Sequence, residues 1–233
     1  MPDIGEGFVY YAVFLFSTTL HEAAHAWAAK IGGDLTAYHG GQVSLDPRPH
    51  IRRAPFGMVV LPIISVVLSG WPFGFASAPY SIDWARRYPR RAAWMALAGP
   101  GSNLTLVLLS GAVINIGLLL GWFHAPQSIT FGHIVASNGG GIGDAVAFLL
   151  GVFFSLNLVL FILNMLPVPP LDGSGALPLL LPAETVPRYQ HLIWTQPAIS
   201  FIGILVAWQV FGRIFHPMFL FAASVLYPGV SYH

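Results

Sequence analysis

The chain of 233 residues has no cysteine and few charged residues. Without cysteine, disulfides and thiolate metal sites are excluded, so any metal must be held by His, Asp or Glu. Charged residues make up only 8% of the chain, whereas soluble domains carry about 25%. Hydrophobic residues make up 55%, and the mean hydropathy is +0.69. These shortages favour an all-α polytopic membrane protein, and a net charge of +1 gives no sign of a nucleic-acid partner.

Four apolar runs reach the roughly 20 residues that a membrane-spanning helix needs. They cover residues 8–31, 92–121, 144–166 and 198–226. A fifth run, 55–76, has about that length but is interrupted by proline and glycine. With this partial run and shorter pieces, about four to six transmembrane helices are expected. We expect residues 1–233 to form a single membrane domain, with its motifs within 8–175 and a C-terminal helix at 198–226.

Basic residues are concentrated in two loops, 32–53 and 80–91. The positive-inside rule assigns both loops to the cytoplasm, which is impossible if residues 55–76 cross the membrane once. We therefore interpret residues 55–80 as a re-entrant hairpin or short membrane strand, broken near Pro62 or at Gly70–Trp71–Pro72. The alternative is an ordinary fifth span with one basic loop outside. The expected location is the cell membrane of a prokaryote, with the N-terminus outside.

An H-E-x-x-H motif, His21-Glu22-x-x-His25, follows twelve mostly apolar residues, 9–20, within the first apolar run. Residues four apart lie on one face of a helix, so the two imidazoles can share one metal ion. Glu22 lies beside them, placed to take a proton from an activated water. Ionisable residues inside a span cost about 2.5–3.5 kcal/mol each, which favours a functional site over a satisfied polar cluster.

A third ligand is needed, because catalytic zinc usually has three protein ligands and an open position. Asp172 is the best candidate, although Asp-Gly after prolines is also typical of a plain turn. It follows the third apolar run, which should enter the cytoplasmic side. The motif on the first run lies about 9–15 Å below the same interface. The three prolines Pro167, Pro169 and Pro170 would end the helix and let Asp172 fold back toward the ion.

The pair of motifs, H-E-x-x-H and Asn164-x-x-Pro-x-Pro-Pro-Leu-Asp172-Gly, resembles the site-2 protease family of intramembrane metalloproteases. Further similar segments are Gly33-Asp34, Leu45-Asp46-Pro47 and Ala98-Gly99-Pro100-x-x-Asn103, so the resemblance covers about residues 8–175. It implies that His21, His25 and Asp172 bind one zinc ion per chain. It also implies that Glu22 is the general base and that Asn164 assists the substrate or the oxyanion.

The chain departs from the family pattern at one segment. Many short members read A-K-P-V-P where this chain has Ala76-Ser77-Ala78-Pro79-Tyr80. If that segment holds substrate, the preference for substrate would differ here. The chain also has no room for the PDZ or CBS domain of larger members. Asn103 is interpreted as a hydrogen bonder between packed helices.

The expected activity is zinc-dependent hydrolysis of a peptide bond in or near the transmembrane segment of a single-span membrane protein. This is regulated intramembrane proteolysis, with the active site toward the cytoplasmic side. A regulatory partner or homo-oligomerisation would then control access. Two other classes stay open: a zinc-binding transporter or sensor, which would not need Glu22, and a structural scaffold without metal.

Overall fold

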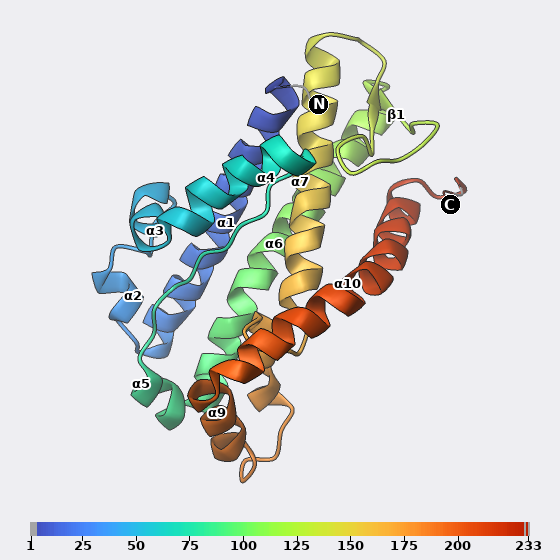
Figure 1. The fold of residues 1–233 in the computed structure, drawn as a ribbon. Coiled ribbons are helices and arrows are strands. Elements are labelled where there is room, and N and C mark those ends of the chain that lie inside the picture. The colour runs from blue at the N-terminus through green and yellow to red at the C-terminus, as the bar shows by residue number, and fades with distance from the viewer. Residues whose placement is uncertain (1–3, 231, 233) are drawn as a thin grey trace.

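The computed structural model describes residues 4–230 and Tyr232, and it is almost entirely helical (Figure 1). The four long helices are α1 (Ile4–Gly32), α6 (Pro89–Leu119), α7 (Ile142–Asn164) and α10 (Pro197–Leu226). The short ones are α2 (Thr36–His39), α3 (Pro47–Arg53), η1 (Phe56–Val60), α4 (Leu61–Ser69), α5 (Ile82–Arg87), α8 (Asp172–Ala176), η2 (Leu177–Leu179) and α9 (Val186–Thr195). The long helices confirm the four apolar runs to within a few residues.

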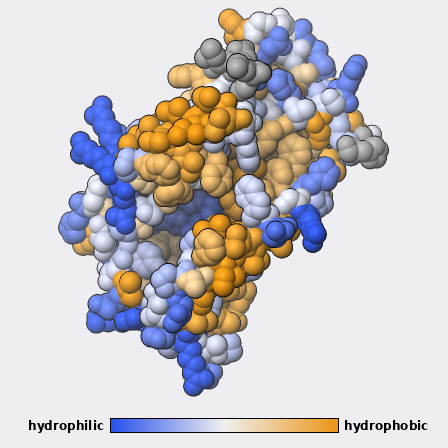
Figure 2. Space-filling model, in the orientation of Figure 1, coloured by the Kyte–Doolittle hydropathy of each residue, from blue (hydrophilic) through white to orange (hydrophobic). Residues whose placement is uncertain are grey.

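Three of these helices, α6, α7 and α10, are long and apolar enough to cross a membrane. α1 has the length, at 29 residues, but Glu6, the H-E-x-x-H motif and Lys30 lower its hydropathy. Large apolar side chains cover the outside, such as Leu119 at 87% exposure and Trp208 at 76%. Figure 2 shows apolar side chains over α4 and along α10, with hydrophilic atoms in the hollow between them. Such a surface is suited to lipid rather than water, and the chain is a membrane protein.

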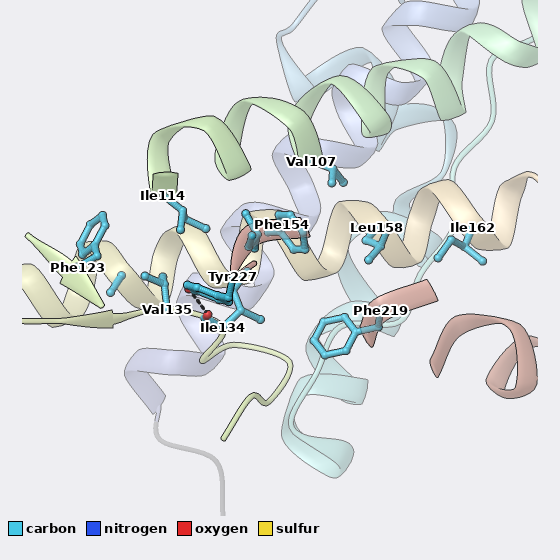
Figure 3. Packing of buried hydrophobic residues seen from close by; sticks show 12 residues of the cluster. Val107, Ile114, Phe123, Ile134, Val135, Phe154, Leu158, Ile162, Phe219 and Tyr227 are labelled. Atoms are coloured by element: carbon cyan, nitrogen blue, oxygen red, sulfur yellow. Dashed lines mark hydrogen bonds between the residues drawn. The ribbon is translucent and has the colours of Figure 1, made fainter. Parts of the chain in front are cut away.

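α6 lies at the centre of the bundle and packs along both α1 and α7, while α10 crosses on the outside (Figure 1). Figure 3 shows the largest core cluster, which includes Ile114 of α6, Phe154 of α7 and Phe219 of α10. Where α10 passes the segment after α7, Gly203 lies directly against the backbone carbonyl of Pro169. A Cβ at this position would collide with that carbonyl, so the crossing requires glycine.

The loop between α6 and α7 is more structured than the sequence indicates. Its glycine run at 139–141 is exposed, but Ile134 and Val135 are 1% and 3% exposed and belong to the core cluster. Tyr227 Oη donates to the carbonyl of Ile134 at 2.6 Å (Figure 3). A pair of two-residue antiparallel strands, β1 (Phe123–His124) and β2 (Ala136–Ser137), closes the loop. The part of the loop that precedes the glycine run is therefore packed into the core.

The region expected to form a hairpin reverses direction once. The chain bends by 113° between α3 and the continuous helix Phe56–Ser69, which runs through Pro62 without a break. This helix ends at Gly70, whose φ of 84° is in the left-handed region that favours glycine. Residues 71–81, here called the return segment, then run back in extended form beside η1 and α4, with Phe75 N donating to the carbonyl of Gly57. Of the two expected breaks, the one at Gly70 is observed.

Candidate metal centre

The H-E-x-x-H motif lies in the C-terminal half of α1, facing α6. His21, Glu22 and His25 are 6%, 5% and 7% exposed, so all three are buried. The spacing of four residues brings the rings together on one helix face, with centroids 4.7 Å apart. The Nε2 atoms lie 3.0 Å apart. Two potential ligand atoms therefore point at the same position, as the motif predicts.

Asp172 reaches this position from the segment after α7. α7 ends at Asn164, and Asp172 opens the short helix α8. Its Oδ2 lies 3.0 Å from His21 Nε2 and 3.3 Å from His25 Nε2, although 151 residues separate it from His21 in the sequence. Ser174, in the same short helix, accepts at its carbonyl a hydrogen bond of 2.7 Å from Tyr189 Oη of α9. Burial raises the pKa of the Tyr189 phenol, which keeps it protonated as a donor.

The three side chains fit a zinc ion. Ligand atoms at about 2.0–2.2 Å from tetrahedral zinc lie about 3.3 Å from one another. The three pairwise distances here, from 3.0 to 3.3 Å, agree with that separation. Among the described residues, these are the His, Cys, Asp and Glu side chains that gather closely enough to hold an ion. Two imidazoles and one carboxylate leave the fourth position for water or substrate, as in catalytic zinc sites.

α6 forms one wall of the centre through Gly99. A Cβ at this position would collide with Nε2 of both His21 and His25. No residue other than glycine could bring the α6 backbone this close to both ligand atoms. The conformational freedom of glycine is not what matters here, since Gly99 lies inside a regular helix and only the missing side chain is needed.

Both histidines are held at their second ring nitrogen. His25 Nδ1 lies 2.7 Å from the carbonyl of Met95, and His21 Nδ1 lies 2.6 Å from Asn103 Oδ1. Such partners orient ligand histidines and leave Nε2 for the metal. The interpretation of Asn103 as a bond between packed helices is therefore incomplete. Met95 was not predicted, because a backbone carbonyl leaves no sequence signal.

Glu22 is buried next to the histidines but lacks a full set of partners. In the part of the chain that the structure describes, no donor lies within hydrogen-bonding distance of its Oε2. A buried acceptor without a partner costs about 1–3 kcal/mol or more when charged. Such a group is poorly explained by stability alone, so it is a candidate for chemistry.

Asn164 lies apart from the three converging side chains. It is the last residue of α7, partly buried, and its Nδ2 donates to the carbonyl of Leu160 at 3.0 Å. No hydrogen bond joins it to His21, His25 or Asp172 among the described residues. The structure thus brings together His21, His25, Asp172 and the adjacent Glu22, and leaves the predicted role of Asn164 untested.

A membrane-embedded helical bundle in which two buried histidines meet a partly buried aspartate has the features of a membrane metalloprotease. Comparison with known proteins agrees. The chain is 30% identical over 242 residues to a Bacillus subtilis protein named "Putative zinc metalloprotease YwhC", covering 91% of this chain and 98% of that protein. The chain belongs to the site-2 protease family and is a zinc metalloprotease.

Two mycobacterial relatives, named "Putative zinc metalloprotease Rip2", are similar over part of their length. The protein from Mycolicibacterium smegmatis is 30% identical over 182 residues, 78% of this chain and 61% of that protein. The one from Mycobacterium tuberculosis is 34% identical over 174 residues, 75% and 58% respectively. No protein-family profile matches the chain. No solved structure matches it either.

Proposed function

We propose that the chain, as one membrane domain over residues 1–233, cleaves a peptide bond in or near the transmembrane segment of a single-span membrane protein. His21, His25 and Asp172 hold the zinc ion, and Glu22 is the general base. One observation carries this proposal: three ligand atoms converge within 3.3 Å inside a bundle of apolar helices, beside a buried carboxylate. Regulated release of a membrane-tethered protein is the corresponding biological role.

The chemical groups at the centre suggest a separate role for each of them in the reaction. When bound, zinc supplies Lewis-acid chemistry, because it polarises a carbonyl and lowers the pKa of water to about 7. Glu22 takes the proton of the attacking water and delivers it to the leaving amine. Asn164 has a second N–H besides the one given to Leu160, and it stabilises the developing oxyanion. A well-placed donor of this kind contributes about 2.7–4 kcal/mol to the transition state.

The return segment offers a binding edge for an unwound substrate. Three alternate residues of its middle part are paired with the rest of the fold: Phe73 N with Ser65 Oγ, Phe75 N with Gly57 O, and Ser77 O with Gln42 Nε2. The backbone groups of Ala76 and Ala78 make no hydrogen bond with other described residues. Alternate residues of an extended chain face opposite sides, so these free groups lie along one edge. We propose that the substrate adds to this edge as a strand.

Replacing Ala76 by proline is expected to slow cleavage by about tenfold, since it removes one free N–H of this edge and one hydrogen bond is worth about 1 kcal/mol or more. Proline suits the extended backbone, so the fold should persist. Cleavage of a single-span substrate in detergent measures the effect. Ala76→Val retains the N–H and should cleave like wild type. Equal rates for Ala76→Pro and Ala76→Val would argue against strand addition.

We also propose that the metal centre faces the cytoplasmic side of a prokaryotic cell membrane. Support comes from the hairpin, because its turn at Gly70 lets the basic loops on both sides of it share one membrane face. Single cysteines introduced as Arg48→Cys and Arg87→Cys should both be labelled by a membrane-impermeant reagent from the cytoplasmic face alone. Labelling of the two positions from opposite faces would contradict the re-entrant arrangement.

The proposed centre is tested by Asp172→Ala. Wild type purified in detergent should contain about one zinc per chain, and Asp172→Ala should lose most of it because a catalytic site needs three protein ligands. Zinc analysis and cleavage of a panel of single-span peptides are the measurements. Asp144→Ala, an exposed acid on α7, is the matched control. Full zinc content in Asp172→Ala would contradict the ligand set, and zinc without any cleavage would favour a transporter or sensor.

A further inference from the structure

A chain of hydrogen bonds runs from His21 across three helices. Asn103 Oδ1 of α6 lies 2.6 Å from His21 Nδ1, and Asn103 Nδ2 donates to Asn157 Oδ1 of α7 at 2.8 Å. Asn157 Nδ2 donates to Ser17 Oγ of α1 at 3.0 Å and to the carbonyl of Phe153 at 2.8 Å. Ser17, Asn103 and Asn157 are all 0% exposed. This series of hydrogen bonds is therefore shielded from solvent, and it starts and ends at residues of α1.

The carbonyl of Phe153, at one end of this series of hydrogen bonds, fixes the donor and the acceptor in each of them. The carbonyl of Phe153 can only accept, so Asn157 must turn its NH₂ group toward it and its Oδ1 toward Asn103. Asn103 must then donate with Nδ2 to that oxygen, which leaves its own Oδ1 facing His21. Since Oδ1 can only accept, Nδ1 of His21 carries the proton. Amide orientation is often ambiguous, but here the backbone carbonyl decides it.

We infer that Asn103 and Asn157 are positioning residues that fix His21 in the tautomer with the proton on Nδ1 and the lone pair of Nε2 free for the metal. A neutral imidazole carries a single N–H, so a proton on Nε2 would remove the ligand. His25 reaches the same state more directly, through the carbonyl of Met95. This inference rests on the metal centre proposed above.

A positioning role makes a different prediction from helix packing. If Asn157 only held helices together, its loss would lower stability and leave zinc affinity unchanged. If it acts through Asn103, its loss should weaken zinc binding although it does not contact any ligand. Partners of this kind typically change metal affinity by about 10–100-fold. The losses of zinc affinity caused by substituting Asn103 and Asn157 should also not add, because Asn157 acts through Asn103.

The experiment measures zinc affinity by chelator competition on the full chain in detergent. Asn103→Leu should bind zinc about 10–100-fold more weakly, Asn157→Leu should be weakened in the same direction, and the double variant should be no weaker than Asn103→Leu alone. Asn103→Asp keeps an acceptor opposite Nδ1 and should retain more affinity than Asn103→Leu. Visible absorption of the Co²⁺-loaded proteins should change in the leucine variants. Asn115→Leu is the matched control, since among the residues that the structure describes Asn115 bonds to the carbonyl of Gly111 in its own helix and to no ligand of the metal centre.

Zinc affinity of Asn157→Leu equal to wild type, or additive losses in the double variant, would overturn the inference while leaving the metal centre intact. Wild type without zinc would overturn the metal centre and the inference together. Thermal unfolding of each variant shows whether the fold persists. Should Asn103→Leu unfold, the comparison of Asn103→Asp and Asn157→Leu with wild type decides in the same way.

Discussion

Glu22→Gln is expected to lower the rate of peptide cleavage by about 10²–10⁴-fold, the usual contribution of a general base, while zinc stays bound. Glutamine has the same shape and also fits the buried site, but its amide cannot accept a proton from water. The three proposed ligands are untouched, since Glu22 is not one of them and its Oε2 has no hydrogen-bond donor among the described residues. Zinc content and single-span peptide cleavage, measured on the same preparation, separate the two effects.

The matched control is Glu6→Gln, which makes the same change on the same helix about four turns before the motif. It should cleave like wild type. Retained cleavage in Glu22→Gln would refute the role of Glu22 and favour a protein in which zinc serves transport or sensing. Loss of zinc from Glu22→Gln would instead mean that this carboxylate supports the ion itself.

Gly99→Ala is expected to weaken zinc binding by about 100-fold or more. This is at least the effect of removing a residue that hydrogen-bonds to a ligand histidine. The added methyl would occupy the space directly against Nε2 of both His21 and His25. The obstacle is steric and lies between two helices that are packed over much of their length, so little relaxation is available. Chelator competition on the purified protein measures the change.

Gly101→Ala provides the control for this substitution. It lies on α6 two residues away, and a Cβ there would meet no atom within 4 Å. Alanine at an open helical position is expected to raise stability by about 0.5–1 kcal/mol and to leave zinc bound. If Gly99→Ala binds zinc as tightly as Gly101→Ala, the proposed position of the ion beside α6 is wrong.

The fold was largely predictable, because long apolar helices depend on composition and length alone. The hairpin was predictable from the placement of arginines, but its turn was not, since Pro62 and Gly70 both interrupt the run. Pro62 lies where the π-helical turn η1 passes into α4 and does not break the helix, whereas Gly70 adopts a left-handed conformation that ends it. The packing of Ile134 and Val135 was missed because it depends on Tyr227, more than 90 residues away.

In the candidate site, the sequence predicted the residues that converge, because each carries a polar group that is expensive in a membrane. It did not predict how they are held. Asn157 is one of a few polar residues in an apolar helix, and such residues are common between packed helices. Its link to His21 depends on the packing of three helices, which the sequence of α7 does not reveal. The requirement for Gly99 is likewise a matter of distance between helices, on which spacing within one helix gives no information.

The contact between Gly203 and the carbonyl of Pro169 joins the outermost long helix to the segment that carries Asp172. Both surfaces are backbone, so no change of side-chain rotamer can absorb a displacement there. Pro169 is followed by a second proline, which leaves little slack over the three residues to Asp172. Tilting of α10 by a neighbouring protein or by a thinner bilayer would therefore displace the segment that positions the partly buried Asp172 carboxylate.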